Sequence, residues 1–136
     1  MTTEPRPETM QIGELAERTG LSLRTIRHYD EVGLLRPSGR SEGGFRLYTA
    51  VDLERLLLIR RMKPLGFSID EMTELLHVVD TLAARADADE RDADERDAAA
   101  MRARLDEFIR DAETRRAKLA EHLAMADEFV GLLRAQ

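Results

Sequence analysis

The amino-acid sequence predicts a mainly α-helical chain, in which a small helix–turn–helix unit with a β-hairpin is followed by one long coiled-coil helix. Three observations predict this fold class. Apolar residues recur at helical spacing over most of the chain, two short helical patterns flank a glycine near the N-terminus, and a heptad pattern occupies the last third. The 136 residues suffice for one small domain and an appended helix.

Residues 1–9 are polar and contain two prolines, so they are expected to be a disordered lead-in. Residues 10–35 follow the pattern helix, break, helix. The first helix is expected to end at Gly20, because glycine adopts the positive φ that commonly closes a helix. Ser22 is a good N-cap for the second helix. Its apolar residues expected to face inward are Leu23 and Ile26.

Residues 36–48 have the composition of a small β-hairpin. Glycines at three positions supply turns, and the run Phe-Arg-Leu-Tyr that ends the segment alternates as a strand does. Thr49 and Asp52 then have the spacing of a capping box that opens a helix, and Ser68 and Glu71 repeat that spacing. The sequence therefore predicts a glycine-turned hairpin and two further helices.

The segment 81–97 is acidic and poor in large apolar side chains. It contains the run Asp-Ala-Asp-Glu-Arg twice in tandem, at 87–91 and 92–96. It is expected to be a solvated linker or an exposed extension of a helix, and a functional acidic patch is the alternative.

Residues 101–135 carry apolar residues in alternating steps of four and three, which predicts a helix roughly 50 Å long within a coiled-coil segment over 98–135. Arg115 and His122 interrupt this stripe, where they either fix the register of a coiled coil or lie at its splayed edge. Because no other element in the sequence is large enough to cover the stripe, we expect the same helix of a second copy to do so, in a homodimer. The residues expected at that interface are Leu105, Phe108, Ala112, Leu119, Leu123, Ala126, Phe129 and Leu133.

The net charge of −6 is unevenly distributed along the chain. Residues 1–63 carry 11 basic and 9 acidic residues, whereas residues 64–136 carry 10 basic and 18 acidic ones. An evenly acidic chain would argue against a nucleic-acid partner, but the first part of this one is weakly basic. Whether its arginines share one face therefore decides whether a nucleic-acid partner is plausible on charge.

The second helix of the helix–turn–helix leaves a row of polar side chains facing outward: Arg24, Thr25, Arg27 and His28. A helix fits the major groove of DNA, and arginine makes bidentate contacts with guanine or phosphate. The hairpin beside it would contact the flanking backbone as a wing, through Arg40, Arg46 and Tyr48. For the arginines the alternative is a solvated surface or pairing with Asp30 and Glu31, and for Tyr29 and Tyr48 it is packing alone.

Residues 10–80 contain five distinctive motifs: Ile-Gly-Glu-Leu-Ala at the start, Arg-His-Tyr-Asp in the second helix, Gly-Leu-Leu-Arg-Pro after it, Gly-Phe-Arg-Leu-Tyr in the hairpin and Leu-Gly-Phe-Ser-Ile-Asp-Glu-Met beyond it. With these motifs the segment resembles the MerR family of transcriptional regulators. The resemblance implies a winged helix–turn–helix DNA-binding domain over 10–80. It also implies an antiparallel dimerisation coiled coil over 98–135, which matches the family in position and pattern.

The resemblance implies a set of contacts with double-stranded DNA. Those of the recognition helix and wing fall on Ser22, Arg24, Thr25, Arg27, His28, Tyr29, Arg40, Arg46 and Tyr48, and Lys63 would meet a phosphate. The implied regulator is a homodimer on a pseudo-palindromic promoter site. It would bend and untwist the spacer between two promoter elements so that RNA polymerase engages both.

The chain has no cysteine, which excludes disulfides, thiolate metal sites and iron–sulfur clusters, and no metal or cofactor is expected. No stretch is apolar enough to span a membrane, no secretory signal is visible, and no catalytic motif is present, so we expect a non-enzymatic protein of the cytoplasm, associated with the nucleoid. Three alternatives stay open: an architectural DNA-bending protein, a coiled-coil scaffold, and a protein that sequesters a small molecule where the coil meets the helices of 49–80. The sequence identifies no effector.

Overall fold

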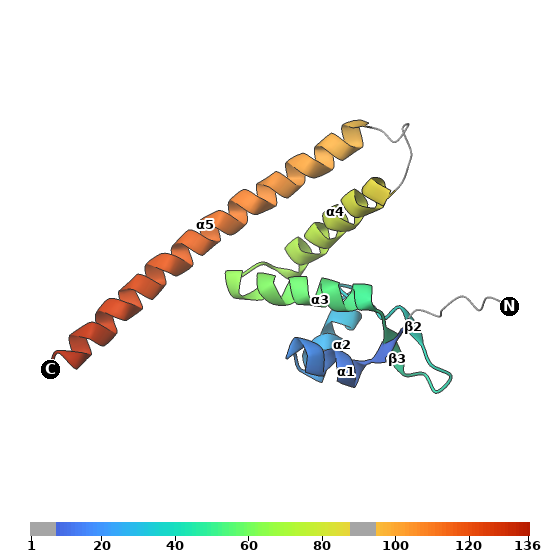
Figure 1. Cartoon of the computed structure of the whole chain (residues 1–136), viewed down its shortest axis with the longest axis horizontal. Coiled ribbons are helices and arrows are strands. Elements are labelled where there is room, and N and C mark those ends of the chain that lie inside the picture. The colour runs from blue at the N-terminus through green and yellow to red at the C-terminus, as the bar shows by residue number, and fades with distance from the viewer. Residues whose placement is uncertain (1–7, 88–94) are drawn as a thin grey trace. The chain divides into compact units, whose positions relative to one another are not determined.

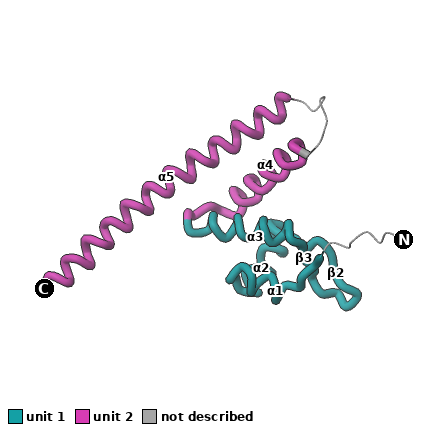
Figure 2. The backbone as a smooth tube through the Cα atoms, viewed as in Figure 1, with its two compact units in different colours: residues 1–64 teal, residues 65–136 magenta. Residues whose placement is uncertain are grey.

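The computed structural model is mostly helical and divides into two compact units, one up to Pro64 and one from Leu65 (Figure 2). The structure describes residues 8–87 and 95–136. The lead-in predicted for 1–9 therefore lies outside the described residues except for its last two, and most of the tandem acidic run also lies outside them. The division at Pro64 precedes the boundary at residue 80 that the sequence predicts, and the extent of the 10–80 domain stays a prediction.

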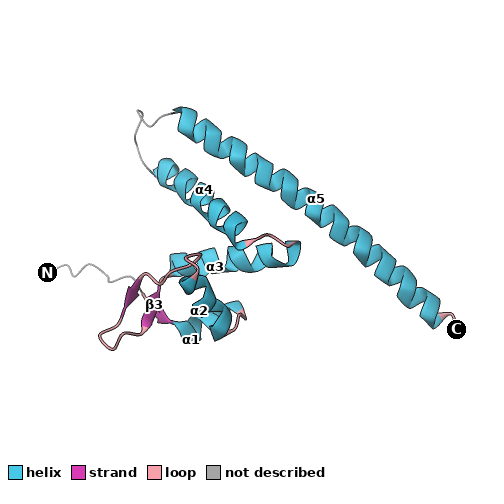
Figure 3. Cartoon of the chain, turned by 180° about the vertical axis from the view of Figure 1, so that it is seen from behind, coloured by secondary structure: helices cyan, strands magenta, loops and turns pink. Residues whose placement is uncertain are grey.

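The first unit consists of three helices and a small antiparallel sheet (Figures 1 and 3). The helices are α1 (Ile12–Thr19), α2 (Leu23–Glu31) and α3 (Ala50–Met62). The strands are β1 (Met10–Gln11), β2 (Gly39–Arg40) and β3 (Arg46–Tyr48), in the order β1-β3-β2. The predicted helix–turn–helix and hairpin are thus confirmed. A single 3₁₀ turn, η1 (Lys63–Leu65), follows α3.

The strand β1 is absent from the sequence prediction, which places residue 10 at the start of a helical pattern. Met10 instead pairs with Tyr48, and Gln11 pairs with Leu47. A strand of two residues is too short to show an alternating pattern, and its partner is distant in sequence. The hairpin is therefore the larger part of a three-stranded sheet that includes the start of the described chain.

The predicted caps shape the first unit. Gly20 closes α1 with a φ of 72°, and the Ser22 hydroxyl accepts the backbone N–H of Thr25 at 3.1 Å. At the start of α3, the Asp52 carboxylate accepts the backbone N–H of Thr49 at 2.9 Å. The same oxygen accepts the hydroxyl of Ser38 at 2.5 Å, so this buried carboxylate also links the hairpin to α3.

The core of the first unit contains side chains from every helix and from the sheet. Those that are completely buried include Leu15, Ile26, Tyr48, Leu56 and Ile59. The prediction that Leu23 faces inward is wrong, because its side chain is 39% exposed. It occupies the first turn of α2, where the end of the helix leaves one side of the side chain open to solvent.

The second unit is a pair of helices, α4 (Ile69–Asp87) and α5 (Glu95–Arg134), that run in opposite directions (Figures 1 and 3). The predicted capping box opens α4: Glu71 donates its backbone N–H to the Ser68 hydroxyl at 3.1 Å, and its carboxylate accepts the Ser68 N–H at 2.9 Å. α4 lies along the N-terminal half of α5.

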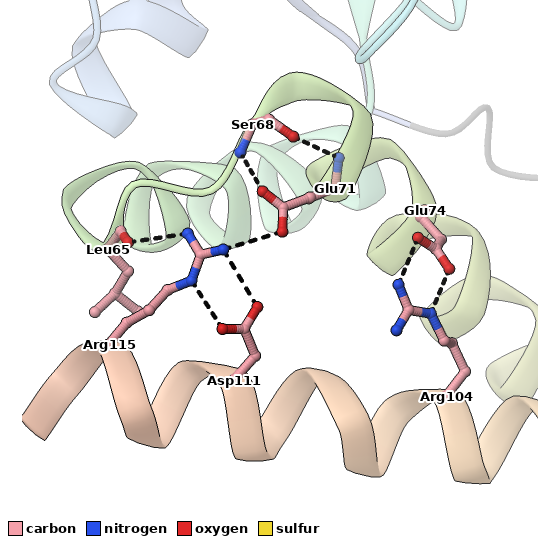
Figure 4. A network of polar contacts seen from close by, with 7 residues as sticks. All are labelled: Leu65, Ser68, Glu71, Glu74, Arg104, Asp111 and Arg115. Carbon is pink, nitrogen blue, oxygen red and sulfur yellow. Dashed lines mark hydrogen bonds and ion pairs between the residues drawn. The ribbon is translucent and has the colours of Figure 1, made fainter.

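Arg115 of α5 links that helix to the start of α4 (Figure 4). Its guanidinium contacts the carboxylates of Asp111 at 3.1 Å and Glu71 at 3.0 Å, donates to the carbonyl of Leu65 at 3.2 Å, and lies 4.0 Å from the ring centre of Phe67. The hydrogen bonds that this arginine donates to the Asp111 carboxylate are the main reason that its pKa is raised. The sequence predicts that Arg115 either fixes the register of a coiled coil or lies at its splayed edge. Neither interpretation describes this contact within one chain.

Arg104, about three turns before Arg115 on α5, makes a second contact of the same type (Figure 4). It pairs with Glu74 of α4 and with Glu107 of its own helix, and its guanidinium lies 4.4 Å from the ring centre of Phe108. Phe108 is buried and its ring lies 6.4 Å from that of Phe67. Two aromatic rings, each covered by an arginine, therefore hold the helix pair together.

The prediction that no local element covers the heptad stripe is wrong for the N-terminal part of α5. Phe108 is only 5% exposed, and Leu105 and Ala112 are partly buried. Leu123 and Phe129, by contrast, are 63% and 61% exposed. The reason is length: at 1.5 Å per residue α4 extends roughly 30 Å and α5 roughly 60 Å, so one helix covers about half of the other.

Candidate nucleic-acid interface

The helix α2 presents two arginines on one exposed face. Arg24 and Arg27 are three residues apart, so they are neighbours on the helix surface. Neither makes a hydrogen bond or ion pair with any residue that the structure describes, and His28 beside them is also exposed. Two cations without internal partners can bind an anion without breaking an existing contact.

The two hydroxyls that the sequence places in this interface lie at the start of the same helix. Those of Ser22 and Thr25 are 2.8 Å apart, and Ser22 also caps α2. A hydroxyl has one donor and two acceptor positions, so both groups keep some capacity for a further partner. Their first role in the structure is to fix the N-terminal turn from which the arginines project.

The two tyrosines are packing residues in this structure. Tyr29 is 4% exposed and Tyr48 is completely buried. Burial raises the pKa of both phenols. The Tyr48 hydroxyl has no hydrogen-bond partner within the described part of the chain. Their positions fit the packing alternative that the sequence left open, and a contact with DNA by either stays a prediction.

The wing arginines differ in how far their charge is already satisfied. Arg46 donates from Nε to the Asp30 carboxylate at 2.8 Å, and this hydrogen bond raises the pKa of Arg46. The pairing with Asp30 that was the alternative for this residue therefore occurs. Arg40 donates to the carbonyl of Gly44 at 3.0 Å and lies 4.0 Å from the Asp30 carboxylate, but its side chain is half exposed, so part of its charge still faces solvent.

The end of α3 adds a second basic surface. Lys63 is exposed on the 3₁₀ turn, and Arg60 and Arg61 are exposed just before it. These two arginines line a hollow together with Leu57 and Pro64. The sequence prediction included only the lysine, although the run Arg-Arg-Met-Lys is itself a signal of clustered positive charge.

Two family models match the sequence of this chain, and the first of them spans the capped helix and the wing. The model of the MerR HTH family regulatory protein matches residues 10–78, and the model described as MerR, DNA binding matches residues 53–128. The chain belongs to the MerR family. The resemblance seen in the sequence motifs is thus confirmed, and so is the predicted fold class.

The MerR-family relatives include proteins that align over most of the chain. The HTH-type transcriptional regulator CueR of Yersinia pestis is 35% identical over 90% of this chain and 82% of its own length. A MerR-family transcriptional regulator from Bacillus cereus is 29% identical, with 93% of this chain and 75% of that chain covered and a TM-score of 0.58. HiNmlR, a MerR family regulator lacking the sensor domain, bound to promoter DNA, shares the fold at 23% identity, with a TM-score of 0.66 over 93% and 91% of the chains. This chain spans about half the length of several other curated relatives that it matches.

In residues 8–87 and 95–136, no three His, Asp or Glu side chains converge as a metal site requires. None of the helices in those ranges is both long and apolar enough to cross a lipid bilayer. The sequence contains no cysteine, so no thiolate ligand is available to the chain.

Proposed function

We propose that this chain is a sequence-specific regulator of transcription that binds double-stranded DNA. The observation that carries the proposal is the exposed pair Arg24 and Arg27 on a capped α2, with a wing beside it and without partners among the described residues. A helix of this kind enters the major groove, where arginine discriminates guanine through a bidentate contact. Membership of the MerR family, and the match to its DNA-binding model, support this function over the sequestering of a small molecule.

The regulator acts as a homodimer in this proposal. The C-terminal half of α5 supports it, because its stripe of large apolar side chains is uncovered in the single chain. The most exposed members of this stripe are Leu123, Phe129 and Leu133. An apolar stripe of this length is typical of a surface that another protein covers, and a second copy closes the assembly by symmetry. Two DNA-binding units joined in this way recognise a pseudo-palindromic site.

The regulator acts at a promoter, in the cytoplasm and on the nucleoid, and RNA polymerase is its partner there. It bends and untwists the spacer between two promoter elements, so that part of its specificity comes from deforming DNA. Run-off transcription from a template that carries the selected site tests this step. An architectural DNA-bending protein would leave transcript levels unchanged, whereas the regulator changes them.

Replacing the arginines of α2 tests the DNA contact. Arg24→Ala and Arg27→Ala are each expected to cost about 1–3 kcal/mol of binding, a loss of about 5- to 150-fold, because a bidentate base contact disappears. The measurement is a fluorescence-anisotropy titration at physiological salt, on a duplex selected by the wild-type chain from a random pool.

Arg110→Ala is the matched control for these variants, since Arg110 is an exposed arginine of α5 and its loss changes the net charge equally. It is expected to bind as the wild type does. Wild-type affinity for both α2 variants would contradict the proposed function.

Lys63 is proposed to bind a phosphate rather than a base. Lys63→Ala is then expected to weaken binding to the selected duplex and to an unrelated duplex by the same factor. It is also expected to lower the slope of log affinity against log salt concentration by about 0.9, because one fewer counterion is released. Titrations at several salt concentrations measure both quantities, and an unchanged slope would argue against the phosphate contact.

A further inference from the structure

The contact between Asp30 and Arg46 joins α2 to the central strand of the sheet. Asp30 lies in the last turn of the helix, and its carboxylate accepts the Nε–H of Arg46 at 2.8 Å. Arg46 begins β3, the strand that pairs with both β1 and β2. One hydrogen-bonded ion pair therefore links the recognition helix to the central strand of the sheet.

The charges of this pair already neutralise one another within the protein. The side chains of Asp30 and Arg46 are only 16% and 26% exposed, and the hydrogen bond between them raises the pKa of the arginine. A phosphate that approached Arg46 would also approach the Asp30 carboxylate, and two anions at that distance repel. Arg24 and Arg27 face no such carboxylate among the described residues.

The second wing arginine is directed toward the same carboxylate. Arg40 has one guanidinium nitrogen 4.0 Å from the Asp30 oxygen that Arg46 contacts, while another donates to the carbonyl of Gly44 in the turn. Arg40 and Arg46 are also partners in the β2–β3 register. The carboxylate thus lies beside both strands of the hairpin at the point where they pair.

We propose that Asp30 and Arg46 are positioning residues, which hold the wing at a fixed distance from α2, and that Arg46 acts through Asp30 rather than on a DNA phosphate. The proposal rests on the proposed function, since it concerns how the DNA-binding surface is held. A surface fixed before binding loses less conformational freedom when the complex forms, so breaking the pair lowers affinity without removing any contact with DNA.

The test compares three variants of the full chain on the selected duplex: Asp30→Asn, Arg46→Met and the double variant. Each single change is expected to weaken binding about tenfold, and the double variant no further, because all three lose the same ion pair. The slope of log affinity against log salt concentration is expected to stay at its wild-type value in Arg46→Met. Glu31→Gln, which removes the neighbouring exposed carboxylate, is the matched control and is expected to bind at least as tightly as the wild type.

A phosphate contact by Arg46 predicts the opposite results. Asp30→Asn would then bind more tightly, because it frees the arginine, and Arg46→Met would lower the salt slope by about 0.9. Either result overturns the proposal. Should Asp30→Asn lose helicity by circular dichroism, Asp30→Glu decides instead: partial loss of affinity supports positioning, and wild-type affinity contradicts it. If the wild-type chain does not bind DNA, the proposed function is overturned as well. If Arg24→Ala loses affinity as expected but Asp30→Asn binds with wild-type affinity, this inference alone is overturned.

Discussion

The double variant Leu123→Glu and Phe129→Glu is expected to be monomeric and to lose about 10²- to 10⁴-fold in affinity for a duplex with two half-sites. Both side chains are more than 60% exposed on α5 and lie in the stripe proposed to bind a second copy. Two carboxylates there would have to be buried without a partner in the dimer. Once the two chains separate, the second half-site is no longer bound at the high effective concentration that a physical link provides.

Sedimentation velocity at micromolar concentration measures the oligomeric state, and titration of duplexes with one and two half-sites measures the advantage of pairing. The control is Glu121→Gln with Glu128→Gln, two exposed changes on the same helix that leave the apolar stripe intact. They are expected to leave the dimer and its affinity unchanged. A charged double variant that still sediments as a dimer would show that another surface joins the chains.

The local structure of the first unit follows from single residues. Gly20 ends α1 because it accepts a positive φ, Ser22 caps α2, and Thr49 with Asp52 opens α3. Each signal acts within four residues, so no knowledge of the rest of the chain is needed. The strand β1 could not be predicted in the same way, because its only support is pairing with a strand far along the sequence.

The sequence does not show which element covers an apolar stripe on a helix. A heptad pattern shows that one face of a helix is covered, but the same pattern serves a neighbour in the chain and a second copy. Phe108 and Phe129 are separated by whole heptads and look alike in the sequence, yet one is buried and the other exposed. The length of α4 limits how much of α5 packs within its own chain, and the contacts of Arg115 with Leu65 and Glu71 join residues far apart in the sequence.

In the candidate interface, the sequence predicts the exposure of the α2 arginines correctly but not the environment of the wing residues. Arg24 and Arg27 face outward because helical periodicity places them on the side of α2 away from the buried face formed by Ile26 and Tyr29. Arg46 and Tyr48 are two residues apart on a strand and therefore share one face of the sheet, so their exposure depends on what packs on that face. The burial of Tyr48 and the contact between Arg46 and Asp30 are therefore tertiary facts, which the spacing of residues does not contain.

Phe108→Ala is expected to cost the second unit about 3–5 kcal/mol of stability, because it removes a buried aromatic ring and leaves a cavity. The side chain is 5% exposed, packs against Phe67 and lies under the guanidinium of Arg104. The remaining ion pair between Arg104 and Glu74 is exposed and offsets little of this, since such pairs contribute about 0–1 kcal/mol. Hydrogen exchange of the α4 amides measures the effect, because local opening of the helix pair exposes them.

Phe129→Ala is the matched control for Phe108→Ala, since it removes the same ring from the same helix at an equivalent heptad position. Its side chain is uncovered in the single chain, so the helix pair should keep its protection against exchange. Any loss of stability should instead depend on protein concentration, because only the dimer is weakened. The loss in Phe108→Ala should be independent of concentration. If the two variants behaved alike, either both rings would lie in the dimer interface or neither would, and the assignment of the first half of α5 to α4 and the second half to another copy would be wrong.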